Sequence, residues 1–234
     1  MIVSVHLADV GVRAAAAALR ARPDAAALAG LRYAETTIAV QLGGGPVPAP
    51  RLGRVGLIAA WDDDAALDRF LSGHPFARRL AGGWHVRLEP LRAAGAWSGL
   101  GDLPGEERAV DQSEPVAVLT LGRLRLRRAV SFVRTSARAE RQAVSDPALL
   151  AATGLARPPR LVATFSLWRT AEAMRAYALG DAGDGHLRAI RAHAARAFHH
   201  ESVFARFRPY GARGAWDGRD PLAAAVDEPA VAGA

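Results

Sequence analysis

The chain has 234 residues, half of them hydrophobic, and a formal net charge of +7 with no cysteine. The missing cysteine excludes disulfides, iron–sulfur clusters, thiolate ligation of haem and cysteine nucleophiles, and it fits a reducing cytoplasm, where we expect the protein. All basic side chains other than histidine are arginines spread along the chain, which favours an anionic small ligand over nucleic acid. We expect neither a signal peptide nor a membrane span, because the apolar N-terminus lacks a basic leader and no apolar run approaches about 18 residues.

The first half of the chain is expected to follow the order β-α-β-β-α-β, from its apolar periodicity and its helix boundaries. The expected elements are strand 2–7, helix 12–22, strands 31–42 and 55–61, a helix after residues 62–64, a helical turn at 75–80 and strand 84–91. The aspartates at 62–64 supply an N-cap and an acidic first turn. The glycine- and proline-rich stretch 43–50 is expected to be a turn between strands.

The second half is expected to repeat this order after a linker at 98–114 that is rich in glycine, proline and acidic residues. The expected elements are strand 116–121, helix 128–144, strands 149–155 and 160–168, helices 171–179 and 186–198, and strand 202–209. We therefore divide the chain into a first unit at 1–97, the linker, a second unit at 115–222 and a flexible tail at 223–234.

An internal repeat supports this division. The segment that begins at Trp61 matches the segment that begins at Trp168, at an offset of 107 residues. Residues 87–99 match residues 206–218 at an offset of 119, and seven of these thirteen pairs are identical. Self-similarity on this scale predicts two equivalent subdomains, with the second copy enlarged before its last strand.

The predicted fold class is α+β, a tandem duplicated ferredoxin-like (βαββαβ) unit that forms a dimeric α/β-barrel-type fold within one chain. A ferredoxin-like sheet carries helices on one face and leaves the other face to be covered. Two such sheets placed face to face would cover each other and enclose a pocket.

Six segments can be compared with a known family: Gly30-Leu-Arg, Trp84-His-Val-Arg-Leu-Glu-Pro-Leu91, Ala163-Thr-Phe-Ser-Leu-Trp168, Gly185-His186 with Ala189-Ile-Arg191, Glu201-Ser-Val-Phe-Ala-Arg-Phe207 and Gly214-Ala-Trp216-Asp-Gly-Arg-Asp-Pro-Leu222. Together these segments resemble the spheroidene monooxygenase family, the carotenoid-oxidising enzymes of phototrophic bacteria and their relatives. The resemblance runs from about residue 30 to residue 222 and is strongest after Leu161.

The resemblance implies a monooxygenase that depends on haem b and acts on a hydrophobic small molecule. A ferredoxin or a reductase would supply the electrons, since the chain has no nucleotide-binding motif. A homodimer is one option for the assembly. The chain departs from the family at Phe198-His199-His200, where aromatic residues are usual, and in its shortened glycine-rich loop at 43–45.

Histidine is the expected axial ligand of the haem, with methionine and tyrosine as the other donors that this composition allows. His186 falls on the family's Gly-His position and is the predicted ligand. His193 is the second candidate and His200 the third. His186 and His193 lie about 10.5 Å apart along a helix, so they cannot both bind one side of the iron. A solvent-exposed helix N-terminus is the competing interpretation of His186.

Five positions besides His186 and His193 complete the predicted site. Phe165 and Trp168 would line the macrocycle, and Arg206 would pair with a propionate or with iron-bound oxygen. The adjacent His199 and His200 would act as an acid–base pair. The competing interpretations are a strand–helix corner for Trp168, a solvated strand face for Arg206 and a surface pair for the histidines. Trp97 and Trp216 are expected to plug the barrel ends.

Two other functions remain open from the sequence. The first keeps the haem and binds the substrate directly to iron, in a dehydratase or nitrogen-transfer reaction. The second is a barrel without haem that only binds a lipophilic ligand.

Overall fold

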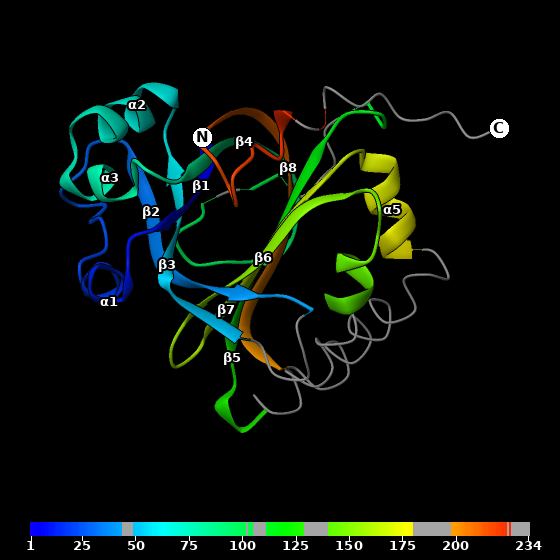
Figure 1. Ribbon diagram of the computed structural model, residues 1–234, viewed down its shortest axis with the longest axis horizontal. Helices are drawn as coiled ribbons and strands as arrows, with labels where there is room; N and C mark the ends of the chain where they lie inside the picture. The colour runs from blue at the N-terminus through cyan, green and yellow to red at the C-terminus, as the bar shows by residue number, and fades with distance from the viewer. Residues whose placement is uncertain are drawn as a thin grey trace.

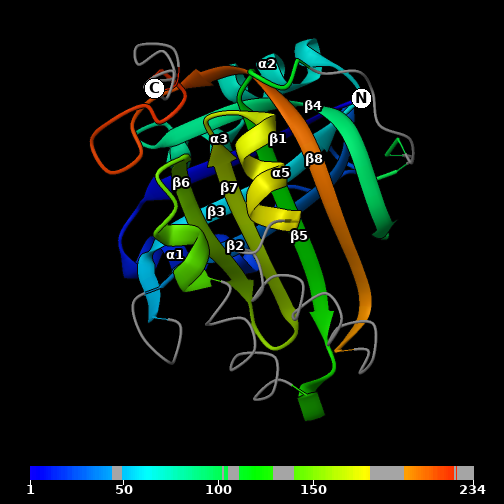
Figure 2. The same ribbon diagram turned by 90° about the vertical axis from the view of Figure 1, so that its right-hand side faces the viewer.

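The computed structural model describes residues 1–43, 49–101, 103–104, 111–128, 140–179, 198–223 and 225. Within this part of the chain, eight antiparallel strands close into a barrel in the order β1-β3-β2-β6-β7-β5-β8-β4 (Figures 1 and 2). The elements of the first half are β1 (Ile2–Asp9), α1 (Val12–Arg20), β2 (Leu31–Gln41), β3 (Ala49–Trp61), α2 (Asp64–Gly73), α3 (Pro75–Leu80) and β4 (Trp84–Ala96). Those of the second half are β5 (Val116–Leu124), the 3₁₀ turn Leu126–Arg128, β6 (Leu149–Arg157), β7 (Leu161–Trp168), α5 (Ala171–Leu179) and β8 (His199–Arg213).

The two halves arrange their strands alike. The first half has the order β4-β1-β3-β2 and the second half has β8-β5-β7-β6. The sheets do not lie face to face as separate layers, as the sequence had suggested. They join edge to edge at two seams, where β2 pairs with β6 over three register positions and β4 pairs with β8 over eleven. These two seams close the barrel, although only three residues of β2 are paired with β6.

The long β4–β8 seam explains where the expected boundaries were wrong. β4 continues to Ala96 rather than ending at residue 91, and β8 runs over His199–Arg213 rather than 202–209. The expected helix 128–144 is helical at residues 140–144, and its earlier part lies outside the described residues. The expected helix 186–198 also lies outside them, except for Phe198, which is buried and not helical.

The barrel interior is filled with apolar side chains from alternate positions of the strands. Leu119, Phe165 and Phe207 are fully buried there. Trp216 closes one end of the interior, where its ring lies 6.2 Å from that of Phe165. Trp97, which directly follows the last residue of β4, is 5% exposed. Both tryptophans therefore pack into the barrel core, as predicted.

Helices cover the outer faces of the barrel, with α1, α2 and α3 on one flank and α5 on the other (Figure 1). Trp61 at the end of β3 packs against Phe70 of α2, with ring centroids 5.0 Å apart. Trp168 at the end of β7 packs against Tyr177 of α5, with ring centroids 4.8 Å apart. The repeated tryptophans thus occupy equivalent strand–helix corners.

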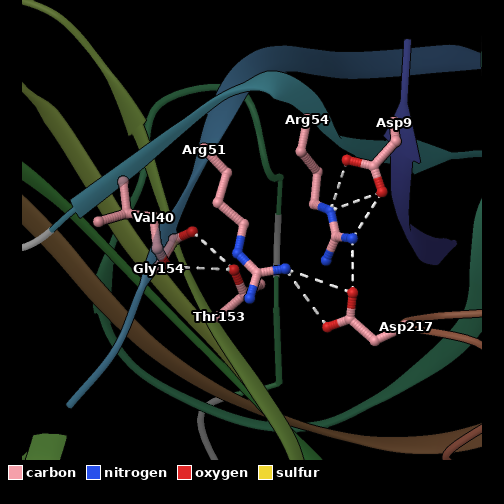
Figure 3. A network of polar contacts seen from close by, with 7 residues as sticks. All are labelled: Asp9, Val40, Arg51, Arg54, Thr153, Gly154 and Asp217. Atoms are coloured by element: carbon pink, nitrogen blue, oxygen red, sulfur yellow. Dashed lines mark hydrogen bonds and ion pairs between the residues drawn. The ribbon is translucent and has the colours of Figure 1, made fainter. Parts of the chain in front are cut away.

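The segment after β8 is tied back to the first half by Arg54 on β3 (Figure 3). Arg54 donates to both carboxylate oxygens of Asp9 and, over 2.6 Å, to Asp217. Arg51 adds a longer contact of 3.3 Å to Asp217. None of the helices in the described part of the chain is long and apolar enough to cross a membrane.

Candidate functional site

The outer face of the second-half sheet, here called the C-terminal face, carries three of the seven predicted site residues, Trp168, His199 and Arg206. It consists of the side chains that alternate away from the barrel interior on β5, β7 and β8. Its half-exposed members are Thr120, Val162, Thr164, Ser166, Ser202, Phe204 and Arg206. One end of the face is covered by α5, whose Met174 and Tyr177 pack on Val116, Val118 and Trp168.

On the corresponding outer face of the first half, the outward side chains of β3 are buried. Val55, Leu57 and Ala59 on β3 are fully buried. The positions that correspond to them at the offset of 107 are Val162, Thr164 and Ser166, which are all half-exposed. The side chains at these positions are therefore less completely buried in the second half than in the first.

Arg206 lies on the C-terminal face, because Ala205 and Phe207 on either side of it are buried in the barrel interior. The strand alternation expected from the sequence is confirmed. Arg87 is the corresponding residue of the first half, and its guanidinium binds Asp64 and Asp68 of α2 over 2.5 Å each. At the positions of these two carboxylates, α5 has alanine and Arg175. Carboxylates on α2 therefore bind Arg87, whereas α5 has no carboxylates at the corresponding positions for Arg206.

His199 also lies on the C-terminal face, where its ring covers Gly122 of β5. A Cβ atom on Gly122 would lie 2.5 Å from Cδ2 and 2.6 Å from Nε2 of His199. Gly122 is four residues from Val118, the register partner of Arg206, so His199 and Arg206 are roughly 13 Å apart along the strand. His200 is exposed. The two adjacent histidines therefore do not share one environment, and only His199 contacts the face.

Glu201, the acidic residue nearest to this pair in sequence, is engaged elsewhere. Its carboxylate accepts a hydrogen bond from Arg123 over 2.8 Å and from the Ser98 hydroxyl over 2.5 Å. Although burial opposes the shift, these donors hold the pKa of Glu201 below its usual value. Glu201 therefore serves to fasten the chain after β4 to β8 and does not complete a metal site with the histidines.

Phe165 and Trp168, the predicted lining of the macrocycle, lie on opposite sides of the sheet. Phe165 is buried in the barrel interior, whereas Trp168 packs under α5 and donates its indole N–H to Ser166 over 3.0 Å. The structure therefore brings Trp168, His199 and Arg206 onto one face and leaves Phe165 outside it.

The candidate donors for a haem iron can be compared on this face. Burial raises the pKa of Tyr177 to about 12, so its phenol stays protonated, and Met174 is packed in the cluster under α5. His186 and His193 lie outside the described residues, so their assignment stays a prediction. A haem needs an axial donor, an apolar wall and a cation for its propionates, and on the C-terminal face Phe204 and Arg206 could supply the wall and the cation.

Known proteins resemble this chain both in sequence and in fold. No protein-family model matches it. It is 32% identical over 196 residues to a spheroidene monooxygenase of Rhodobacter capsulatus, covering 80% of this chain and 79% of the relative. It is 35% identical over 178 residues to a spheroidene monooxygenase of Rubrivivax gelatinosus, covering 73% of this chain and 66% of the relative.

Two solved structures of aldoxime dehydratases resemble the fold. One, in complex with butyraldoxime, has a TM-score of 0.56 at 10% identity and covers 95% of this chain and 85% of that chain. The other has a TM-score of 0.53 at 11% identity and covers 95% and 87%. At this level of identity the likeness shows the fold alone, a ferredoxin-like barrel.

Proposed function

This chain belongs to the spheroidene monooxygenase family, and on that premise we propose that it is a haem b-dependent monooxygenase acting on a hydrophobic small molecule. One observation carries the location of the site. The C-terminal face is half-exposed at Val162, Thr164 and Ser166, where the first half is fully packed. A partly exposed face with apolar and hydroxyl-bearing side chains beside a helix is a suitable place for a flat cofactor.

His186 would hold the haem iron, with His193 as the alternative, and the bound haem would supply the activation of oxygen. Arg206 would bind a propionate, since a guanidinium pairs with a carboxylate through two parallel hydrogen bonds. Phe204 would form part of the apolar wall, whereas Trp168 is 2% exposed under α5 and is given no role in this proposal. The electrons would come from a ferredoxin or a reductase.

His199 is the residue we assign to proton transfer on this face. Its imidazole lies against Gly122, so its position is set by packing. His200, the other member of the predicted acid–base pair, is exposed at the end of the strand and is given no role in this proposal. A histidine fixed at the edge of an apolar site can hold or move a proton near neutral pH.

We also propose that the two halves arose by duplication of one unit. The shared strand order, the matched tryptophan corners and the matched positions of Arg87 and Arg206 support this origin. In the second copy the outer face would then have stayed less tightly packed and acquired the cofactor. In the first copy the outward side chains of β3 would have become fully buried.

Isotope labelling tests the reaction class. Spheroidene would be incubated with the haem-loaded protein, reduced ferredoxin and ¹⁸O₂, and the product analysed by mass spectrometry. We expect ¹⁸O in the product and no turnover without reductant or without oxygen. Turnover that continues in the absence of both would contradict an oxygenase and favour chemistry in which the substrate binds directly to the iron.

A further inference from the structure

One end of the barrel carries a projecting cluster of arginine and apolar side chains, here called the arginine tip. It is formed by the 3₁₀ turn after β5 and by the loop between β6 and β7. The backbone N–H of Leu124 donates to the carbonyl of Arg160 over 2.8 Å, which places the two loops side by side. In both views the turn lies at the lower end of the molecule, beyond the end of β5 (Figures 1 and 2). The exposed members of the arginine tip are Leu126, Arg127, Arg128, Pro158, Pro159 and Arg160.

The apolar side chains of the arginine tip face water rather than the barrel core. Leu126 is 50% exposed, whereas Leu124, two residues earlier, is 6% exposed. Pro158 and Pro159 are exposed as well. A single exposed leucine is common on protein surfaces, so the charges around it decide what it can bind.

The charge of the arginine tip is positive and is not compensated within it. The two segments that form the tip and flank it, 115–139 and 147–171, contain no aspartate or glutamate. Its three exposed arginines, Arg127, Arg128 and Arg160, have no ion-pair partner among the residues that the structure describes. Three guanidinium groups are therefore available to an anionic partner.

Two carboxylates at this end of the barrel are already paired with other arginines. Glu201 accepts from Arg123 over 2.8 Å, and its side chain is 19% exposed. Glu35 accepts from Arg157 over 2.6 Å, and its side chain is 6% exposed. Because both carboxylates are engaged and largely buried, they leave the positive charge of the arginine tip exposed to solvent.

An anionic lipid surface fits this combination better than other anionic partners. Guanidinium groups bind phosphate through paired hydrogen bonds, and a leucine between them can enter the apolar layer below the headgroups. A single-stranded nucleic acid would be expected to stack its bases on aromatic side chains, and the exposed members of the tip are not aromatic. An acidic protein would pair with the arginines but would offer the projecting leucine no apolar layer.

We propose that the arginine tip attaches the protein to the surface of a membrane that contains anionic phospholipid. The three arginines pair with lipid phosphates, and Leu126 inserts between the headgroups. This attachment goes beyond the proposed function and does not require haem. Leu124 is the register partner of His199, so the attached protein turns the His199 end of the C-terminal face toward the lipid. Entry of a hydrophobic substrate from the lipid at this end is the one step that rests on the proposed function.

Co-sedimentation of the full chain with vesicles tests the proposal. One set of vesicles contains equal parts of phosphatidylglycerol and phosphatidylcholine, and the other contains phosphatidylcholine alone. We expect binding to the anionic vesicles and about tenfold weaker binding to the neutral ones. The triple variant Arg127→Gln/Arg128→Gln/Arg160→Gln should lower partitioning into the anionic vesicles about hundredfold, since each arginine near the surface contributes about fivefold.

A matched triple variant controls for the overall charge. Arg13→Gln/Arg69→Gln/Arg79→Gln removes three exposed arginines from α1, α2 and α3, which lie outside the arginine tip. It should lower partitioning by no more than about threefold, because its charges are not held against the lipid.

A second pair of variants tests the insertion of Leu126. Leu126→Ser should lower partitioning about tenfold, because the leucine side chain no longer gains from leaving water. Leu52→Ser, the same change at a leucine of β3 that is 57% exposed, should leave partitioning unchanged. All the substituted side chains are exposed, so the variants are expected to fold, and circular dichroism checks this.

Three results would overturn the proposal. They are no binding to the anionic vesicles, equal losses in the two triple variants, and wild-type partitioning of Leu126→Ser. The last result would point to a partner bound by charge alone, such as a nucleic acid or an acidic protein. His186→Ala separates the proposal from the haem assignment, since it should abolish haem binding and leave vesicle binding unchanged.

Discussion

The ring of His199 occupies the space that a Cβ atom on Gly122 would need, with ring atoms 2.5 and 2.6 Å from that position. A glycine on β5 thus seats a histidine that begins β8 on the C-terminal face. The contact links a backbone position of one strand to the imidazole that we assign to proton transfer.

Gly122→Ala should therefore displace His199 without unfolding the barrel. The new methyl group forces the imidazole to move, and we expect turnover to fall to the level of His199→Ala, with a loss of about 1 kcal/mol in the free energy of unfolding. Histidine ring signals in NMR spectra and the rate of product formation measure the two effects. Gly73→Ala is the control, because nothing lies within 4 Å of its added Cβ. Full activity of Gly122→Ala would contradict the role given to His199.

Arg206→Gln and Arg87→Gln should differ in effect although the two residues correspond. Arg206→Gln should speed the loss of haem about tenfold, because one cation for the propionates is removed. Arg87→Gln should leave the haem unaffected and lower the free energy of unfolding by about 1 kcal/mol, since it breaks partly exposed ion pairs to α2. Haem transfer to apomyoglobin measures the rate of haem loss, and urea unfolding measures the stability of each variant. Equal rates of haem loss in both variants would contradict the assignment of Arg206.

Arg54→Met should destabilise the fold by about 2 kcal/mol. The guanidinium side chain is 11% exposed and binds Asp9 and Asp217, so its removal leaves Asp9 without this partner and Asp217 with only the longer contact to Arg51 (Figure 3). The expected loss of stability is moderate because both carboxylates are more than half-exposed and can be solvated. Asp217→Asn should cost less, since Asp9 keeps its pair. Urea unfolding that gives the wild-type midpoint for Arg54→Met would show that this network does not hold the C-terminal segment.

Acid should weaken the fold through His6. Burial, aided by His85 and Arg87, lowers the pKa of His6 from 6.5 to about 3 in the folded state. The unfolded chain therefore takes up a proton below pH 6.5 that the folded chain does not, so the free energy of unfolding falls as the pH falls from 6.5 toward 3. The contribution approaches about 1.4 kcal/mol per pH unit.

His6→Gln should remove this contribution and flatten the pH dependence between pH 6 and pH 4. Leu57→Val is the control, because it alters the buried core without removing a titratable group. Urea unfolding at a series of pH values measures the slope for each variant. An unchanged slope in His6→Gln would contradict the shift assigned to this residue.

Local patterns allowed much of the fold to be predicted. The helices at 75–80 and 171–179 are found with the expected boundaries. The alternation that separates Arg206 from Phe207 is also confirmed, since period two follows directly from strand geometry. The same rule could have separated Phe165 from Trp168, which lie an odd number of residues apart on one strand.

Contacts between distant segments could not be predicted in this way. The extension of β4 to Ala96 depends on pairing with β8, more than a hundred residues later in the chain. The contact of Gly122 with His199 and the stack of His6 on His85 depend on strand register, which no single segment encodes. In the sequence His6 and His85 are isolated residues.

The absorption spectrum of the haem-reconstituted protein tests the account most directly, with His186→Ala and His193→Ala measured beside the wild type. We predict a Soret band in the wild type and in His193→Ala, and its loss in His186→Ala. A wild-type protein without a Soret band would contradict the haem-dependent function. A band that survives in His186→Ala and is lost in His193→Ala would move the axial ligand to His193.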